Sequence, residues 1–252
     1  MPRILLLCSR EAVFHPPALH EIIVRNRGDI VGVAVFEDPQ RTTLAASIRD
    51  AISLDGWRAV PRLGRRWLAH RWNCIRHSPP HFTSVEKLFV SHDLVPAFFK
   101  NPNLPESLAF VASLHPDVIL NIQPWYLREP MLRSAQLACL NVHTAALPKY
   151  RGVQPVVRAF LADDSTIGVS IHTMTPEIDA GEVVAQRLLP RRASVFDSYK
   201  ATFAVVPDLV GEAIDAIKTG KIIAKVSASD AYWGKLSADE RATFRRRGLR
   251  YF

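Results

Sequence analysis

The chain has 252 residues, of which 48% are hydrophobic and 22% charged, and its formal net charge at pH 7 is +8. These values suit one large α/β domain, or one domain with an extension, and exclude a disordered or collagen-like chain. No stretch approaches the ~18 consecutive apolar residues of a membrane-spanning helix, and the apolar run at residues 4–8 is too short for a signal peptide. The three cysteines have no metal-type spacing, so we expect free thiols, no metal site and a cytoplasmic location.

The N-terminal residues predict a strand–helix–strand unit. Residues 4–8 and 30–36 are near-continuous apolar runs typical of buried parallel strands, and apolar residues recur on one face of 18–25 as in a helix. The turn after the first strand is Ser9-Arg10-Glu11, and the first glycine is Gly28. Because a dinucleotide or phosphate loop needs glycines in that turn, the sequence argues against both, although Arg10 could still hold a phosphate.

Residues 41–83 carry a concentrated basic charge. The spacing of Leu44, Ile48 and Ile52 indicates a helix, and tryptophans are interleaved with arginines from 57 to 76. We expect an amphipathic helix there, whose tryptophan rings pack inward and whose arginines face water. Contact with a membrane surface or a partner, and contact with a nucleotide or nucleic acid, are the alternatives.

Strands and helices alternate through most of the remaining chain. The strands are expected at 93–99, 118–122, 140–142, 168–175, 183–189 and 222–226, and the helices at 106–115, 130 onward, 156–161, 196–219 and after the capping box that begins at Ser237. Pro207 should kink the helix at 196–219 or mark its true start. This alternation predicts a mainly parallel, doubly wound (Rossmann-like) sheet with helices on both faces.

Three polar segments follow predicted strands and should line one cleft, because ligands bind at the carboxyl ends of strands in such folds. They are residues 9–11, 123–127 and 141–152. Asn141 and His143 are two residues apart on a strand, so their side chains point to the same side. Asp179 lies on a turn before Gly181 and supplies a carboxylate.

An amide, an imidazole and a carboxylate are the parts needed to transfer an acyl group to an amine. His143 can act as the base or as a charged donor, and Asn141 can donate to the oxyanion. Asp179 can orient the imidazole and raise its pKa. Each residue also has a structural alternative, since asparagine and aspartate are common in turns and a histidine can simply end a strand.

Several sequence blocks resemble the folate-dependent formyltransferases, a family that includes enzymes acting on methionyl-tRNA, glycinamide ribonucleotide and sugar nucleotides. The blocks are Pro116-Asp117-Val118-Ile119, Asn141-Val142-His143 followed by Leu147-Pro148-Lys149-Tyr150-Arg151-Gly152, then Gly168-Val169-Ser170-Ile171-His172 and Ile178-Asp179-Ala180-Gly181. One departure is Thr144-Ala145, where the family usually has Pro-Ser or Ala-Ser. The resemblance covers residues 85–220 well and the first 40 loosely.

The resemblance implies 10-formyltetrahydrofolate as the formyl donor and no metal. It implies Asn141, His143 and Asp179 as catalytic residues. For the donor it implies Trp125, Tyr126, Leu127, Glu177 and Ile178, and for the acceptor we expect Arg10, Lys149, Arg151 and Gly152. It also implies a catalytic domain over residues 1–220, with an insertion at 41–83 and a short extension at 221–252.

The expected function is formyl transfer to a small-molecule amine, with a nucleotide-linked amino sugar as the first choice. Glycinamide ribonucleotide is disfavoured because the glycine-rich phosphate loop is absent. The alternatives are a formyltetrahydrofolate deformylase, a non-catalytic binding module and a truncated enzyme of the methionyl-tRNA type. We expect no nucleic-acid partner, and a homodimer is left open.

Overall fold

The computed structural model describes residues 2–11, 13–37, 52–76, 84–227 and 229–252. The helix expected around Leu44 and Ile48 lies outside these residues. None of the described helices is both long and apolar enough to cross a membrane.

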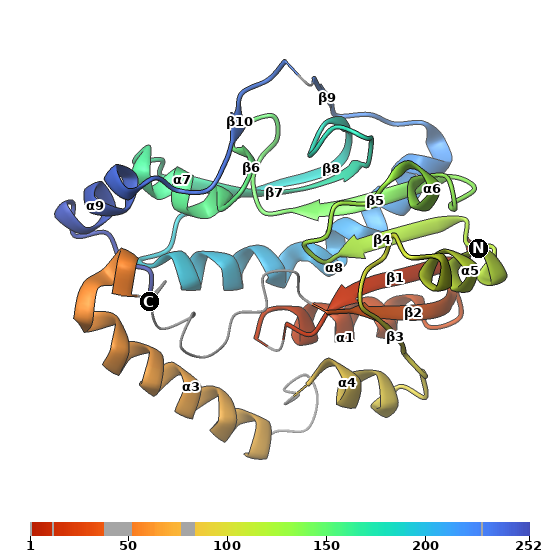
Figure 1. Cartoon of the computed structure of the whole chain (residues 1–252), viewed down its shortest axis with the longest axis horizontal. Helices are drawn as coiled ribbons and strands as arrows, with labels where there is room; N and C mark the ends of the chain where they lie inside the picture. The colour runs from red at the N-terminus through yellow and green to blue at the C-terminus, as the bar shows by residue number, and fades with distance from the viewer. Residues whose placement is uncertain (1, 12, 38–51, 77–83, 228) are drawn as a thin grey trace.

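An eight-stranded sheet forms the centre of the molecule (Figure 1), with the strand order β3-β2-β1-β4-β5-β7-β8-β9. The pairs from β3 to β5 are parallel, and the pairs from β5 to β9 are antiparallel. The predicted mainly parallel sheet is therefore confirmed, with an antiparallel end. The strands are β1 (Ile4–Ser9), β2 (Ile30–Phe36), β3 (Ala97–Phe99), β4 (Val118–Ile122), β5 (Ala138–His143), β7 (Thr166–Thr173), β8 (Gly181–Pro190) and β9 (Ala224–Val226).

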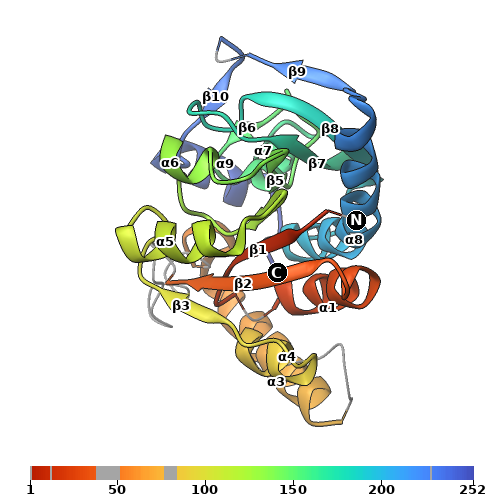
Figure 2. The same cartoon turned by 90° about the vertical axis from the view of Figure 1, so that its right-hand side faces the viewer.

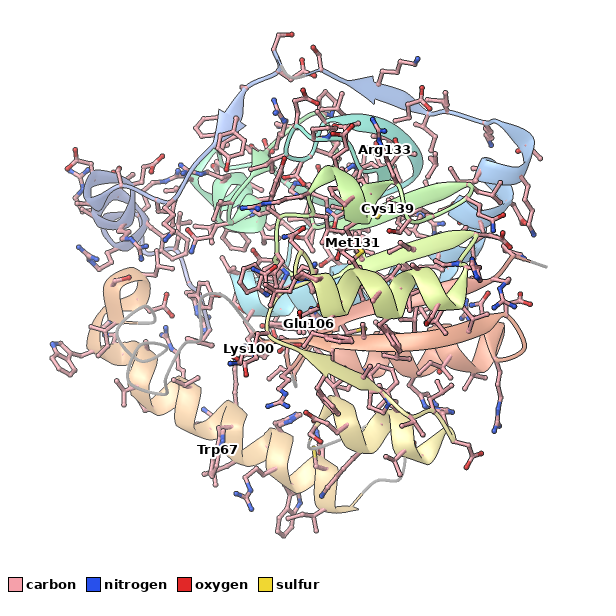
Figure 3. All side chains as sticks on the ribbon, turned by 45° about the vertical axis from the view of Figure 1, so that its right-hand side comes forward. Trp67, Lys100, Glu106, Met131, Arg133 and Cys139 are labelled. Carbon is pink, nitrogen blue, oxygen red and sulfur yellow. The ribbon has the colours of Figure 1, made fainter. Side chains whose placement is uncertain are left out.

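Helices cover both faces of this sheet, as Figure 2 shows. On one face, α1 (His15–Asn26), α4 (Val85–Ser91) and α8 (Val195–Thr219) pack against Ile4, Leu6 and Cys8 of β1. On the other face, α5 (Pro105–Leu114) and α6 (Glu129–Leu132) pack against Leu5 and Leu7. Successive residues of β1 thus face opposite cores, which explains why buried parallel strands are apolar at every position. Met131 and Cys139 belong to the second core (Figure 3).

A third cluster joins the C-terminal part of the chain to the rest. It contains Phe160 of α7 (Pro155–Leu161), and Leu236 and Phe244, of which Phe244 lies on α9 (Ala238–Arg246). The predicted capping box of α9 is confirmed, since Ser237 and Glu240 bond each other's backbone N–H groups. A two-stranded parallel pair, β6 (Arg151–Gly152) and β10 (Tyr232–Trp233), adds a second link. The division of the chain at residue 220 and the insertion at 41–83 stay predictions.

The orientation predicted for the tryptophans is wrong. The basic segment forms a short 3-10 turn (Gly56–Arg58) and α3 (Ala59–Arg76), but the side chains of Trp57, Trp67 and Trp72 are exposed. The inward side of α3 is occupied instead by Arg66, whose guanidinium bonds both carboxylate oxygens of Asp197, at 2.8 and 2.9 Å. The inward face of α3, where the tryptophan rings were expected, is therefore attached by an ion pair.

Two boundaries also differ from prediction. The edge strand β3 begins only at Ala97, because residues 92–93 form a turn in which Asp93 has a positive φ. Pro207 lies inside α8, twelve residues after its first residue, so it does not mark the start of the helix. The helix begins at the Ser194 cap, whose hydroxyl accepts from the N–H of Asp197.

Replacing Phe244 by alanine should lower the free energy of unfolding by about 3–5 kcal/mol, because a buried ring is removed from the third cluster. Urea denaturation followed by circular dichroism measures the loss. Val95→Ala, at a position 91% exposed, is the control and should change stability by no more than about 0.5 kcal/mol. Equal stability of the two variants would show that α9 does not contribute to the common core.

Candidate active site

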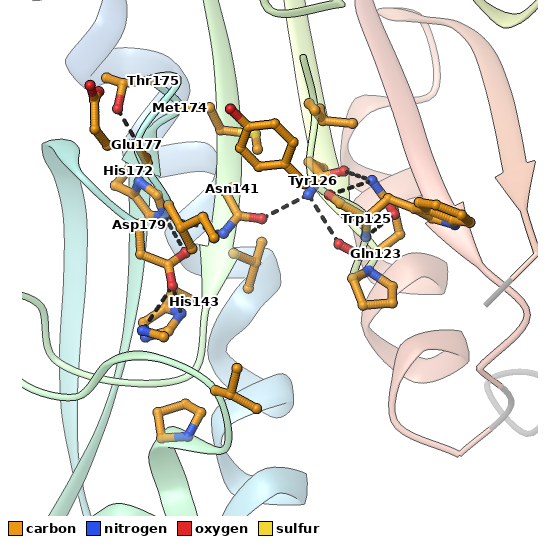
Figure 4. A pocket seen from close by; sticks show the side chains of 18 of the residues that line it. Gln123, Trp125, Tyr126, Asn141, His143, His172, Met174, Thr175, Glu177 and Asp179 are labelled. Carbon is orange, nitrogen blue, oxygen red and sulfur yellow. Dashed lines mark hydrogen bonds and ion pairs between the residues drawn. The ribbon is translucent and has the colours of Figure 1, made fainter. Parts of the chain in front are cut away.

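A cavity of about 350 Å³ opens where β4 and β5 end and where the chain turns between β7 and β8. It lies at the carboxyl edge of the parallel strands, as predicted from the fold class. Polar residues from several elements meet there, and all but one of them are labelled in Figure 4. They are Asn121, Gln123, Asn141, His143, His172 and Asp179.

A chain of hydrogen bonds crosses the floor of this cavity. The N–H of Trp125 donates to Oε1 of Gln123, and Nε2 of Gln123 donates to Oδ1 of Asn121 at 2.6 Å. Nδ2 of Asn121 then donates to Oδ1 of Asn141 at 2.8 Å. Nδ2 of Asn141 lies 3.2 Å from Nε2 of His172, whose Nδ1 lies 2.9 Å from the carbonyl oxygen of Thr173 (Figure 4).

The two ends of this chain determine its direction. A backbone N–H can only donate and a carbonyl oxygen can only accept, so the amide oxygen of Gln123 faces Trp125 and Nδ1 of His172 carries a hydrogen. The bonds between them must then all run the same way. Asn141 consequently presents its NH2 group on the side of His172. Because Nε2 of His172 can accept only one of the two hydrogens, the other can be donated to a bound molecule.

His143 is buried between a carbonyl and a carboxylate. Its Nε2 donates to the carbonyl oxygen of Tyr150 at 3.1 Å, and its Nδ1 lies 3.5 Å from Oδ2 of Asp179. Burial lowers the pKa of His143 below its ordinary value, and the nearby Asp179 carboxylate only partly offsets this. In the neutral ring, the proton therefore sits on Nε2 and the lone pair on Nδ1.

Asp179 is held by the backbone of a neighbouring segment. Its φ is +48°, and its Oδ2 accepts from the N–H of Gly152 at 3.0 Å. Burial alone would raise the pKa of Asp179, but the two histidines and this N–H outweigh burial and keep the pKa below its ordinary value. A carboxylate thus stands beside the imidazole of His143.

Only glycine fits at residue 152. Its φ is +108°, and a Cβ there would lie 2.3 Å from the carbonyl oxygen of Trp233. This close approach of β6 to β10 brings the N–H of Gly152 within bonding distance of Asp179.

All five residues predicted to bind the formyl donor line the cavity. They are Trp125, Tyr126, Leu127, Glu177 and Ile178. The hydroxyl of Tyr126 donates to the carbonyl oxygen of Pro176 at 2.7 Å, which joins the loop after β4 to the turn after β7. The walls are therefore formed by two connected loops.

Of the four residues predicted to bind the acceptor, only Gly152 lines the cavity. Arg10 pairs with Glu86 at 3.1 Å and lies over the ring of Phe98, two strands away from β5. Lys149 pairs with Asp164 at 2.6 Å.

Arg151 is 6% exposed and donates to the backbone carbonyl oxygens of Ile178, Ser227 and Asp230. It ties the Asp179 turn to the C-terminal segment, and its charge is not presented to the cavity.

The sequence interpretation assigned no role to three residues of the site, although it placed Gln123 in a segment that lines the cleft. Asn121 and Gln123 stand two apart at the end of β4, the same spacing that identified Asn141 and His143 on β5. His172 was quoted within a sequence block, but no role was assigned to it. It reaches the site because β7 runs antiparallel to β5 and pairs it with Asn141.

Comparisons with known proteins identify proteins that resemble this chain. Residues 83–194 match the family model described as formyl transferase. A methionyl-tRNA formyltransferase from Roseiflexus castenholzii is 36% identical over 121 residues, which cover 47% of this chain and 39% of that protein. The matched region therefore spans less than half the length of this curated relative.

Solved structures share the fold at low sequence identity. Glycinamide ribonucleotide transformylase 1 from Symbiobacterium toebii has 18% identity and a TM-score of 0.58, covering 89% of this chain and 91% of that one. The N-formyltransferase from Helicobacter canadensis, in complex with folinic acid and dTDP-3-aminofucose, has 15% identity and a TM-score of 0.57, covering 97% and 80%. The resemblance noted in the sequence is confirmed for residues 83–194, which match the formyl transferase model.

Arg151→Met should lower the free energy of unfolding by about 1–3 kcal/mol, because buried carbonyls lose a charged donor. Thermal and urea denaturation measure this effect. Lys149→Met removes the neighbouring exposed cation as a control and should cost no more than about 1 kcal/mol. If Arg151→Met kept full stability and only weakened acceptor binding, the structural role would be refuted.

Proposed function

We propose that the protein transfers a formyl group from 10-formyltetrahydrofolate to the amine of a small molecule. The observation that carries this proposal is the meeting of Asn141, His143 and Asp179 in one cavity, whose other walls are the two loops expected to hold the donor. Direct transfer needs a formyl donor, a hydrogen-bond donor to the oxyanion and a base next to a carboxylate, and these are together sufficient. No residue needs to become acylated.

The cavity has the chemistry that a pterin requires. Trp125, Tyr126 and Ile178 offer flat or apolar surface, and the backbone around Glu177 offers polar groups at the cavity wall. The indole N–H of Trp125 is already bonded to the carbonyl oxygen of Glu37, so the ring is fixed in orientation before a ligand arrives. These residues would hold the donor, which supplies the activated formyl carbon.

In the first step the neutral amine attacks the formyl carbon, and the electron pair of the C=O bond moves to oxygen. The amide hydrogen of Asn141 that His172 does not accept can donate to this oxyanion. A donor of this kind is worth about 2.7–4 kcal/mol where it has been measured. His172 and Asn121 act as positioning residues, because they hold the two ends of the Asn141 amide.

In the second step the attacking nitrogen loses a proton and the donor nitrogen gains one as its bond to carbon breaks. Nδ1 of His143 is the base, since Nε2 already donates to Tyr150. The imidazolium formed is stabilised by Asp179, 3.5 Å away. Return of the proton to the leaving nitrogen restores neutral His143 and releases tetrahydrofolate.

For the acceptor, we propose a nucleotide-linked amino sugar. The Helicobacter canadensis neighbour is seen with such a molecule, and the net charge of +8 suits a diphosphate. Methionyl-tRNA is the second candidate, because several curated relatives that match in sequence are methionyl-tRNA formyltransferases. A deformylase, in which water replaces the amine, and a non-catalytic module are the outcomes that the following assay separates from transfer.

Tetrahydrofolate release from 10-formyltetrahydrofolate should require an added amine and should be fastest with dTDP-linked amino sugars. In the same assay His143→Ala should lower the rate about 100-fold or more, because the base is lost. Circular dichroism should show that this variant remains folded.

Three results would contradict the proposal. Release at the full rate without amine would identify a deformylase, and faster transfer to methionyl-tRNA than to any sugar nucleotide would replace the acceptor. Near-normal transfer by His143→Ala would refute the assigned base. The exposed site of Val95→Ala serves as the control for nonspecific effects.

The pH profile follows from the buried histidine. Catalysis needs neutral His143, so kcat/KM should fall on acidification with a midpoint below 6.5, the ordinary pKa of histidine, because burial lowers the pKa. Asp179→Asn removes the carboxylate that opposes this effect, so the midpoint should move further to acid and the plateau should fall. A midpoint that moved to higher pH in Asp179→Asn would contradict the proposed pairing.

A further inference from the structure

Helix α3 carries apolar side chains on the side that faces away from the protein. The exposed fractions are 53% for Trp67, 61% for Leu68 and 72% for Ile75, and Trp57 at the preceding turn is 79% exposed. Figures 1 and 2 place α3 beyond the β3 end of the sheet, and Figure 3 marks Trp67 on it. Large apolar side chains grouped on one exposed helix face indicate a binding surface.

The attachment of α3 to the protein does not use these residues. Ala59 and Leu63 at its start pack with Phe196 and Phe252, and Arg66 bonds Asp197 and lies over the ring of Phe196. The apolar side chains around Trp67 are thus not needed for holding the helix in place.

The same segment is strongly basic. Residues 56–76 contain six arginines and no acidic residue. The guanidinium of Arg71 lies 5.1 Å from the centre of the Trp67 ring, so charge and aromatic surface are adjacent.

An arginine-lined cavity of about 270 Å³ extends the basic surface. It is formed by Arg62, Arg65 and Arg66 of α3 together with Arg250 and Phe252. Within the described part of the chain, Arg65 and Arg250 form no ion pair, whereas Arg62 and Arg66 face Asp55 and Asp197. The cavity therefore retains positive charge that an anionic group can neutralise.

These features distinguish between classes of partner. A second copy of α3 would bring arginines against arginines without an acidic residue between them, which is repulsive. Nucleic acid would pair with the arginines and stack on the tryptophans, but it would bury little of the apolar surface of Leu68 and Ile75. An anionic lipid surface matches both, since its head groups take the arginines and its acyl boundary takes the apolar side chains.

We propose that α3 docks the protein on an anionic phospholipid surface. The helix lies in the plane of the interface, with Trp67, Leu68 and Ile75 inserted at the acyl boundary. Arg65 and Arg71 extend to the head-group phosphates along their aliphatic stems. This surface is separate from the cavity that contains His143, so the proposal does not depend on the proposed function.

Vesicle co-sedimentation of the full chain tests the proposal. Vesicles of phosphatidylglycerol and phosphatidylcholine should bind the protein, and vesicles of phosphatidylcholine alone should bind it far more weakly. Raising the salt concentration should weaken binding. The triple variant Trp67→Ser/Leu68→Ser/Ile75→Ser should lose about tenfold or more in affinity, and Arg65→Gln/Arg71→Gln about fivefold for each arginine removed.

Val24→Ser/Val90→Ser is the matched control, because both valines are exposed on other helices, at 54% and 67%. It should bind vesicles like the unmodified protein, and circular dichroism should show that all variants are folded. Equal binding by the control and the α3 triple variant would overturn the proposal. So would absence of vesicle binding together with α3-dependent binding of single-stranded DNA, or with an α3-dependent dimer in light scattering.

Discussion

The site depends on one hydrogen-bond chain that is anchored to the backbone at both ends. It starts at the N–H of Trp125 and ends at the carbonyl of Thr173, so every amide between them has a single orientation. Buried amides without partners are costly, and an amide that could flip would present oxygen to an oxyanion half of the time. The fixed direction of the chain makes Asn141 a donor before any ligand binds, which is the preorganisation that oxyanion stabilisation requires.

The carboxylate is positioned by a different device. Gly152 approaches Trp233 so closely that no side chain fits, and this approach directs its N–H toward Asp179. Arg151, the residue before it, bonds the carbonyl of Ile178, the residue before Asp179. Arg151 and Gly152 therefore hold Ile178 and Asp179 in place. The strand pair β6–β10 is thus part of the structure of the site. The segment after residue 220 contributes to the site through Trp233, although it lies far in sequence from the blocks that resemble the formyltransferases.

The sequence predicted those parts of the fold that follow from local patterns. Residues 118–122 read as a strand because parallel strands are buried on both faces, and Ser237 read as a cap because its hydroxyl and Glu240 satisfy each other's backbone. Asn141 and His143 followed from the period of two along a strand. His172 did not, since its contact with Asn141 depends on the register between β5 and β7. The tryptophans of α3 were misplaced because arginine and tryptophan can both cover apolar surface, and only the pairing of Arg66 with Asp197 decides which side faces inward.

The cavity and the outer face of α3 are under different structural constraints. The cavity is built from buried groups whose orientations are all fixed by neighbours, so a substitution such as Gly152→Ala disturbs several residues at once. The outer face of α3, with Trp67, Leu68 and Ile75, does not line this cavity. A change there alters what the protein can bind without altering the carboxylate–imidazole pair. An exposed apolar face lowers the solubility of a folded protein unless a partner covers it. The strong positive charge of the same segment favours an anionic surface as that partner.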